Sequence, residues 1–257
     1  MPRAQTADVA VQATDLSLAR SGQRIVDGVS FTLAHGATLT VMGPTGSGKS
    51  SLAAVLAGRP DGDLAVVGGE AIVQGISARR PGRAVRTLTY LAGYLPQGAG
   101  ATLPSRLTVA EVIGEPITSR DRRVNGRALA VRVATLLDEL QLPLGAAQKY
   151  PYELSAGMRQ RVAMARALVL DPRLLVADDV YANLDIEVRG AVREAILRRR
   201  ASYGMSAFIV TNDPDAAREL DADVLVLRSG HVVAYGASAD AMLWTPDEAS
   251  EQRSVVR

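Results

Sequence analysis

The sequence contains no cysteine among its 257 residues. Disulfide bonds, thiolate zinc sites and thiol nucleophiles are therefore excluded as sources of stability or of chemistry. The absence is compatible with a reducing compartment. Apolar residues nevertheless make up 47% of the chain, which is enough to bury the core of one large α/β domain or of two small ones.

Long apolar runs and clustered basic residues are also missing. No run approaches the ~18 apolar residues of a membrane span, and residues 1–6 lack the apolar segment of a signal peptide, so we expect a cytosolic protein. The net charge is only +2, Lys49 and Lys149 are the sole lysines, and aromatic residues are 4% of the total. This composition favours a surface of mixed charge and predicts no nucleic-acid partner.

A glycine-rich segment carries the first functional signal. Residues 43–50 read Gly-Pro-Thr-Gly-Ser-Gly-Lys-Ser, which fits the G-x-x-x-x-G-K-[ST] phosphate loop. Glycines let successive backbone N–H groups turn toward a β-phosphate, Lys49 adds a positive charge, and the Ser50 hydroxyl can ligate Mg²⁺. The predicted nucleotide-binding residues of this segment are Gly43, Pro44, Thr45, Gly46, Ser47, Gly48, Lys49, Ser50 and Ser51. Because the chain lacks cysteine, we expect its metal to arrive with the nucleotide.

Hydrophobic patterning around this loop predicts its structural context. A buried strand over 38–42 enters the loop, and a helix over 52–57, ending near Gly58, presents its N-terminus to the anion. Strands at 9–13, 29–33 and 38–41 predict an antiparallel layer, and 87–95 reads as another strand. Helical periodicity follows at 109–113, 126–142 and 155–170. The later segments 174–178, 186–203, 207–210, 213–220 and 224–227 alternate between strand and helix, which is typical of parallel βα units.

Several further motifs follow the loop in a fixed order. They are Tyr-Leu-Pro-Gln at 94–97, Leu-Ser-Ala-Gly-Met-Arg-Gln at 154–160, the strand Leu-Leu-Val-Ala-Asp-Asp at 174–179, Asn-Leu-Asp at 183–185 and Thr-Asn-Asp at 211–213. In this order the chain resembles the nucleotide-binding subunits of ATP-binding cassette (ABC) transporters over nearly its whole length. The resemblance implies an α/β P-loop NTPase (RecA-like) core with an antiparallel β layer and an all-helical insert. It also implies a single domain over 1–257, with a core at 1–97 and 166–257 and a helical subdomain at 98–165 that includes the signature motif.

The resemblance also assigns roles within the site. It implies ATP and Mg²⁺ as ligands, with the metal held by Ser50, Gln97 and Asp178. Asp178 would hold Mg²⁺ through water, as suits a cation that dehydrates reluctantly. Gln97 would also touch the attacking water.

The same resemblance implies a dimer. In this family the signature residues, here Ser155, Ala156 and Gly157, bind the γ-phosphate held by the opposing subunit. Asp185 matches an aspartate that communicates across the dimer. The chemistry would therefore be shared between two chains.

Three positions depart from the family pattern. Asp179 stands where the family places a glutamate that polarises the attacking water, and Asn212 stands where it places the switch histidine. No aromatic residue near Ala19 and Arg20 offers a face for the adenine. A shorter carboxylate reaches the water poorly, and general-base catalysis depends on hydrogen-bond reach. Either these changes are tolerated in an active ATPase, or, as we prefer, the chain has a weakened site and pairs with a complete partner cassette.

Other segments narrow the subfamily. The amino-acid sequence at 103–116, 150–153, 157–161 and 184–189 resembles that of the oligopeptide, dipeptide and nickel importer group. That group implies transmembrane permease subunits, a second cassette in a homo- or heterodimer, and an extracytoplasmic solute-binding protein as partners, at the cytoplasmic face of the membrane. The alternative is a soluble cassette subunit of a non-transport complex, such as one for phosphonate breakdown. We expect the arginine run 198–200 to be a solvated helix end favoured by the helix dipole.

Overall fold

The computed structural model describes residues 9–236 and 243–244. The strands are β1 (Val9–Arg20), β2 (Gln23–Ala34), β3 (Thr38–Met42), β4 (Ala65–Val73), β5 (Ile76–Ser77), β6 (Ala92–Leu95), β7 (Leu174–Asp178), β8 (Ser206–Val210), β9 (Asp223–Arg228), β10 (His231–Gly236) and β11 (Leu243–Trp244). The α-helices are α1 (Lys49–Leu56), α2 (Val85–Leu91), α3 (Val109–Thr118), α4 (Gly126–Glu139), α5 (Ala156–Leu168), α6 (Ile186–Tyr203) and α7 (Pro214–Glu219). Short 3₁₀ turns are η2 (Gly82–Ala84), η3 (Ala99–Thr102), η4 (Leu144–Gln148) and η5 (Pro151–Glu153).

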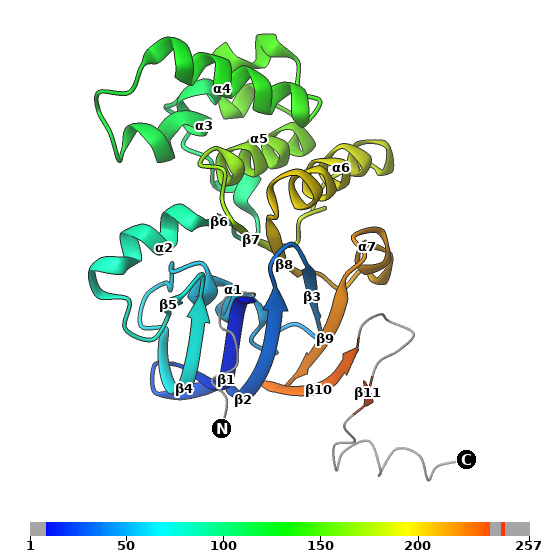
Figure 1. The fold of residues 1–257 in the computed structure, drawn as a ribbon. Helices are drawn as coiled ribbons and strands as arrows, with labels where there is room; N and C mark the ends of the chain where they lie inside the picture. Colours follow the sequence, from blue (N-terminus) through cyan, green and yellow to red (C-terminus); the bar gives the residue numbers. More distant parts are fainter. Residues whose placement is uncertain (1–8, 237–242, 245–257) are drawn as a thin grey trace.

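Two sheets enclose helix α1 (Figure 1). The first is antiparallel with the order β2-β1-β4-β5, and the second has the order β11-β10-β9-β3-β8-β7-β6 with parallel pairing from β9 to β6. Alternate residues of β7 and β8 face opposite sides: Val176 and Phe208 pack toward α1, whereas Leu175 and Ile209 pack toward the helices of the other face. Burial on both faces explains the continuous apolar composition of these strands.

Helices α3, α4 and α5 form a separate helical layer beyond β6 and β7 (Figure 1). Helix α3 begins with a capping box, in which Thr108 accepts a hydrogen bond from the N–H of Glu111 and the Glu111 carboxylate accepts one from the N–H of Thr108. Its apolar face packs on α4 and α5 in one cluster with the parallel sheet. None of the helices in the described part of the chain combines the length and hydropathy needed to cross a membrane.

Two predictions about strands were wrong. Residues 87–91 of the expected strand at 87–95 belong to helix α2 (Val85–Leu91), and only Ala92–Leu95 is extended. Leu88 is fully buried under Gly58, and Thr89 Oγ1 donates to the carbonyl of Val85 one turn earlier, so packing overrides the strand propensity of this threonine- and tyrosine-containing segment. Strand β3 also belongs to the parallel sheet, between β8 and β9, and not to the antiparallel layer.

The predicted domain division stays a prediction. Helix α5 runs across the expected boundary at 165/166. Parts of the predicted core, at residues 1–8, 237–242 and 245–257, lie outside the described residues.

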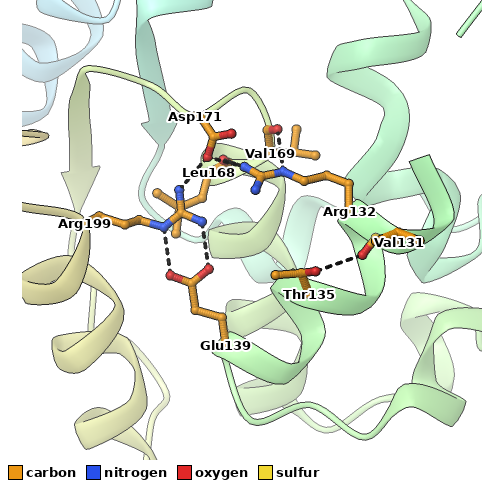
Figure 2. A network of polar contacts seen from close by, with 8 residues as sticks. All are labelled: Val131, Arg132, Thr135, Glu139, Leu168, Val169, Asp171 and Arg199. Atoms are coloured by element: carbon orange, nitrogen blue, oxygen red, sulfur yellow. Dashed lines mark hydrogen bonds and ion pairs between the residues drawn. The ribbon is translucent and has the colours of Figure 1, made fainter. Parts of the chain in front are cut away.

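The arginine run 198–200 is not a solvated helix end. Arg198 is exposed, but Arg199 is 5% exposed and forms a two-bond ion pair with Glu139 of α4, with Nε–Oε1 and Nη2–Oε2 distances of 2.8 and 2.7 Å (Figure 2). Asp171 lies between Arg199 and Arg132, and bonds to both. Burial lowers the pKa of Arg199, but its hydrogen bonds to Glu139 and Asp171 outweigh this and raise that pKa. We call Arg132, Glu139, Asp171 and Arg199 the α4–α6 ion cluster.

Candidate nucleotide site

The phosphate loop connects the end of β3 to the start of α1, as the sequence predicts. Two of its glycines are sterically required. A Cβ on Gly43 would lie 1.9 Å from the carbonyl oxygen of Leu227, and one on Gly48 would lie 2.6 Å from that of Ile25. Both glycines also have positive φ values, of 140° and 98°. The loop is therefore wedged between β9 and β2, which fixes where its backbone amides point.

A cavity of about 610 Å³ opens beside this loop. Its volume lies in the usual range for small-molecule sites. The predicted site residues that line it are Thr45, Gly46, Ser47, Gly48, Lys49, Ser50, Ser51, Gln97, Asp178, Asp179 and Asn212. Asn183, Leu184, Thr211 and Asp213, which also line it, lie in the motifs noted at 183–185 and 211–213 but were not predicted as site residues. The lining residues outside any noted motif are Arg20, Ile25, Tyr181, Ala182, Arg189 and Val210.

Lys49 is a buried cation with neutral partners. Its side chain donates from Nζ to the carbonyls of Gly43 and Pro44, at 2.6 and 2.8 Å, and to Ser47 Oγ at 3.3 Å. Burial lowers the pKa of Lys49, while the nearby charge of Asp178 raises it. These carbonyls and this hydroxyl satisfy the ammonium hydrogens without neutralising the charge, which leaves it available to a phosphate.

Asp178, at the end of β7, is the complementary buried anion. Only 4% of the residue is exposed, and its Oδ2 has no hydrogen-bond partner among the described residues. The pKa of Asp178 is raised, chiefly because the carboxyl is buried. A hydrogen bond from Ser50 lowers this pKa, the negative charge of Asp179 raises it further, and the positive charge of Lys49 lowers it. An unpartnered buried carboxylate oxygen beside a serine hydroxyl suits a hydrated Mg²⁺. The donor set therefore fits the predicted metal, with Gln97 lining the same cavity.

Asp179 follows directly in a strained conformation. Its φ is 59°, its N–H donates to the carbonyl of Val210, and its side chain is exposed to the cavity. Partial loss of water around the carboxyl raises the pKa of Asp179, the charge of Arg189 lowers it and the charge of Asp213 raises it. Arg189 pairs with Asp213 at 3.0 Å. No local sequence motif connects Arg189 with Asp213, because α6 and the turn after β8 supply them separately.

Asn212 has a contact that the sequence did not predict. Its Oδ1 accepts a hydrogen bond from the N–H of Gly43 at 3.1 Å. The side chain thus ties the turn after β8 to the first residue of the phosphate loop. Its role as a replacement for a switch residue stays a prediction.

The signature residues do not line this chain's cavity. Ser155 caps helix α5 by accepting a hydrogen bond from the N–H of Met158 at 3.2 Å, and both Ser155 and Ala156 are exposed. A Cβ on Gly157 would lie 3.1 Å from the carbonyl of Asn183. Asp185 is exposed at the start of α6 and makes no side-chain cap. Ser155, Ala156 and Asp185 are therefore exposed outside the cavity, whereas Gly157 is half-buried and packs against Asn183, which lines it.

A family model described as ABC transporter matches residues 26–182, more than half of the chain. The chain belongs to this family. The family resemblance inferred from the motifs is confirmed. The fold is also similar to that of the ATP-binding cassette MJ0796 in a dimeric state bound to ADP and Pi, with a TM-score of 0.79, 22% identity, and coverage of 92% of this chain and 99% of that one. The predicted fold class, a P-loop core with an antiparallel layer and a helical insert, is therefore confirmed.

Curated relatives of this ABC chain include importer subunits of different kinds. The Fe(3+) ions import ATP-binding protein FbpC of Pseudomonas fluorescens is 34% identical over 218 residues, which are 84% of this chain and 58% of that protein. The oligopeptide transport ATP-binding protein OppD of Mycobacterium bovis is 33% identical over 220 residues, covering 84% and 35%. OppF of Escherichia coli, also an oligopeptide transport protein, is 30% identical over 218 residues, covering 83% and 63%. The chain thus spans 35–63% of the length of these relatives.

Proposed function

We propose that this chain is the ATP-binding subunit of a membrane ABC importer for peptides, nickel or a related small solute. The observation that carries the nucleotide part is a nearby pair of buried charges: Lys49 donates to neutral groups, and the Asp178 Oδ2 has no hydrogen-bond partner among the described residues. Bound Mg-ATP would place a phosphate beside Lys49 and the metal beside Asp178. The importer part rests on the names of the relatives, whose substrates include iron and oligopeptides.

In the proposed mechanism the chain acts by positioning and electrostatics. The loop amides and Lys49 would bind the phosphates, and Ser50 and Asp178 would hold Mg²⁺, which would supply positive charge beside the phosphates. Gln97 orients the attacking water. Asp179 takes its proton inefficiently, because the side chain is one methylene shorter than glutamate.

The exposed signature supports a composite arrangement. Ser155 and Gly157 begin helix α5, whose N-terminal amides and partial positive charge suit an anion. We infer that they complete the site of a second cassette, while Asp185 contacts that partner. This chain's own site, with Asp179 and Asn212, would be the weaker of the two.

A second cleft, of about 260 Å³, is a candidate contact for the transmembrane permease subunits. It adjoins Pro96, next to Gln97, and it is lined by α2, β6 and α5 together with Pro116. Movement at Gln97 on nucleotide binding would therefore reach this surface directly. We place the complex at the cytoplasmic face of the membrane, with an extracytoplasmic solute-binding protein as the further partner.

The test compares two lesions in the complex reconstituted with a complete partner cassette. Ser155→Arg puts bulk and a cation where the partner's γ-phosphate docks, so we expect it to abolish most ATP turnover. Lys49→Ala damages only this chain's weaker site, so we expect the complex to keep a substantial fraction of its ATP turnover. Sizing of both complexes controls for assembly. Equal loss of turnover in the two variants would contradict the proposed division between the sites.

Co-purification separates transport from the alternative. An integral membrane protein isolated with the chain supports the importer. A complex containing only soluble enzymes, such as those of phosphonate breakdown, would instead support the non-transport alternative.

A further inference from the structure

Among the described residues, three cationic side chains line the nucleotide cavity: Arg20, Lys49 and Arg189. Arg20 forms an ion pair with Asp61, with an Nη2–Oδ1 distance of 2.7 Å. Lys49 belongs to the phosphate loop. Arg189 comes from the start of helix α6, its side chain is 38% exposed, and it belongs neither to the phosphate loop nor to the predicted metal ligands.

The guanidinium of Arg189 is held by three contacts. Its Nη1 donates to Asp213 Oδ2 at 3.0 Å, in the turn after β8. Its Nε donates to the carbonyl of Leu184 at 3.4 Å, in the loop before α6. Its central carbon lies over the ring of Tyr181, 5.6 Å from the centroid. These contacts orient the planar cation, and they leave Nη2 without a hydrogen-bond partner among the described residues.

The same contacts place Arg189 at the part of the cavity where the metal is expected. Asn212, the neighbour of Asp213, accepts a hydrogen bond from the first residue of the phosphate loop, so the turn that binds Arg189 also touches that loop. Partial loss of water raises the pKa of Asp179, and the charge of Arg189 is the effect that lowers it. Asp179 directly follows Asp178. Because Mg²⁺ in such sites bridges the β- and γ-phosphate oxygens, the γ-phosphate is expected beside these carboxylates and Arg189.

A cation is useful at this position. The Asn212 side chain carries no charge where the family pattern has a histidine. The γ-phosphate is what distinguishes ATP from ADP, and the fork of a guanidinium matches the oxygens of a phosphate. In other nucleotide hydrolases an arginine of the same chain binds the transferring phosphoryl group.

We propose that Arg189 binds the γ-phosphate of the nucleotide in this chain's own site, and so makes that site selective for a triphosphate over a diphosphate. The inference rests on the proposed nucleotide site. Asp213, Leu184 and Tyr181 orient the guanidinium, and its remaining donors face the ligand. The site then retains ATP through Arg189 while the short carboxylate of Asp179 keeps hydrolysis slow.

The experiment measures dissociation constants of the full chain for Mg-ADP and for the magnesium complex of the non-hydrolysable β,γ-imido analogue of ATP. Arg189→Gln should weaken binding of the analogue by about tenfold, equivalent to about 1.4 kcal/mol, and change ADP binding by less than about twofold. Arg189→Lys keeps the charge and should lose a smaller factor. The matched control is Arg193→Gln, one turn further along α6, which removes an exposed arginine that does not line the cavity and should change neither affinity.

A second comparison separates contact with the phosphate from an effect on Asp179. In the Asp179→Asn background, Arg189→Gln should still weaken binding of the analogue by about tenfold. If the loss disappears in that background, Arg189 only offsets the negative charge of Asp179, and direct binding of the γ-phosphate is overturned.

The remaining outcomes separate this proposal from the proposed function. Unchanged affinity for the analogue in Arg189→Gln, or an equal loss of ADP affinity, would overturn the γ-phosphate contact. Circular dichroism checks that the variant is folded. Arg189→Met, which keeps an unbranched side chain against Tyr181, repeats the measurement if Arg189→Gln is not. A folded wild-type chain that binds neither nucleotide would instead overturn the proposed function.

Discussion

The α4–α6 ion cluster and the phosphate-loop site both bury charge, but only the first is complete. Arg199 finds two carboxylates, and Arg132 donates to the carbonyls of Leu168 and Val169 as well as to Asp171 (Figure 2). In the site, by contrast, Lys49 has neutral partners, and one Asp178 oxygen has no partner within residues 9–236 and 243–244. A buried charge that is satisfied within the chain is structural, whereas one left incomplete points to a ligand.

Breaking the complete cluster should have the largest effect. Arg199→Met leaves Glu139 buried without its cation, and we expect a loss of about 3–5 kcal/mol in the free energy of unfolding. Urea titration measures this loss. Arg198→Met is the control, since its exposed i,i+4 pair with Glu194 should contribute less than about 0.5 kcal/mol.

The double variant Arg199→Met/Glu139→Met should recover most of that loss, because replacing both partners removes the unpaired charge. A double variant no more stable than Arg199→Met would show that packing, and not the unpaired charge, causes the loss.

Restoring the family residues at positions 179 and 212 of the nucleotide site should raise the rate of ATP hydrolysis. Asp179→Glu with Asn212→His lengthens both side chains toward the γ-phosphate, and we expect hydrolysis at this chain's own site to rise at least tenfold, about 1.4 kcal/mol of barrier. Phosphate release is measured in the complex, with the partner cassette inactivated by substitution of its own phosphate-loop lysine. An unchanged rate in a folded complex would show that the weakness of the site has another origin.

The smallest expected effect is that of Asp178→Asn on the free energy of unfolding. Its sign distinguishes the phosphate-loop site from the α4–α6 ion cluster, because removing this charge should stabilise the protein. Burial raises the folded-state pKa of Asp178, so the folded protein holds this proton more tightly than the unfolded chain does. The associated stability is present below the unfolded-state pKa and is lost as the pH rises through the folded-state pKa. At pH 7 without ligand the charged carboxylate is thus destabilising. Asp178→Asn should raise the unfolding free energy by about 1 kcal/mol, a gain that disappears below about pH 4.

Thermal unfolding between about pH 3 and pH 7, in buffer without metal or nucleotide, measures this gain and its loss at low pH. Asp138→Asn, which removes an exposed carboxylate outside the cavity, is the control. Adding Mg-ATP should reverse the order, because the wild type, which keeps the Asp178 carboxylate for the metal, gains more from binding than the variant does. A variant less stable than the wild type at pH 7 would show that the attraction between Lys49 and Asp178 outweighs the burial of the carboxylate.

Sequence reasoning succeeded where an interaction is local and missed those that join distant segments. The phosphate loop is eight consecutive residues between a strand and a helix, so spacing alone predicts its conformation. Arg20 and Asp61 are 41 residues apart, and Glu139 and Arg199 are 60 apart. An arginine run at a helix end carries no sign of which face the core will cover, so Arg199 was expected in solvent.

The same limit explains the error at helix α2. Its threonines and tyrosine favour a strand in isolation, and the burial of Leu88 beneath Gly58 reverses that preference. The site contacts of Asn212 and Arg189 were missed because sheet order, which no local motif encodes, places their segments beside the loop.

Helix α6 connects two surfaces as a stiff rod. Its first turn follows Asp185, and Arg199 near its far end is bound to α4. Eighteen helical residues span about 27 Å, so a tilt of about 5° at one end displaces the other by about 2 Å. The two hydrogen bonds between Arg199 and Glu139 fix α6 to α4, so α4 follows a displacement of α6. The layer of α3, α4 and α5 would therefore move together with the loop that precedes α6.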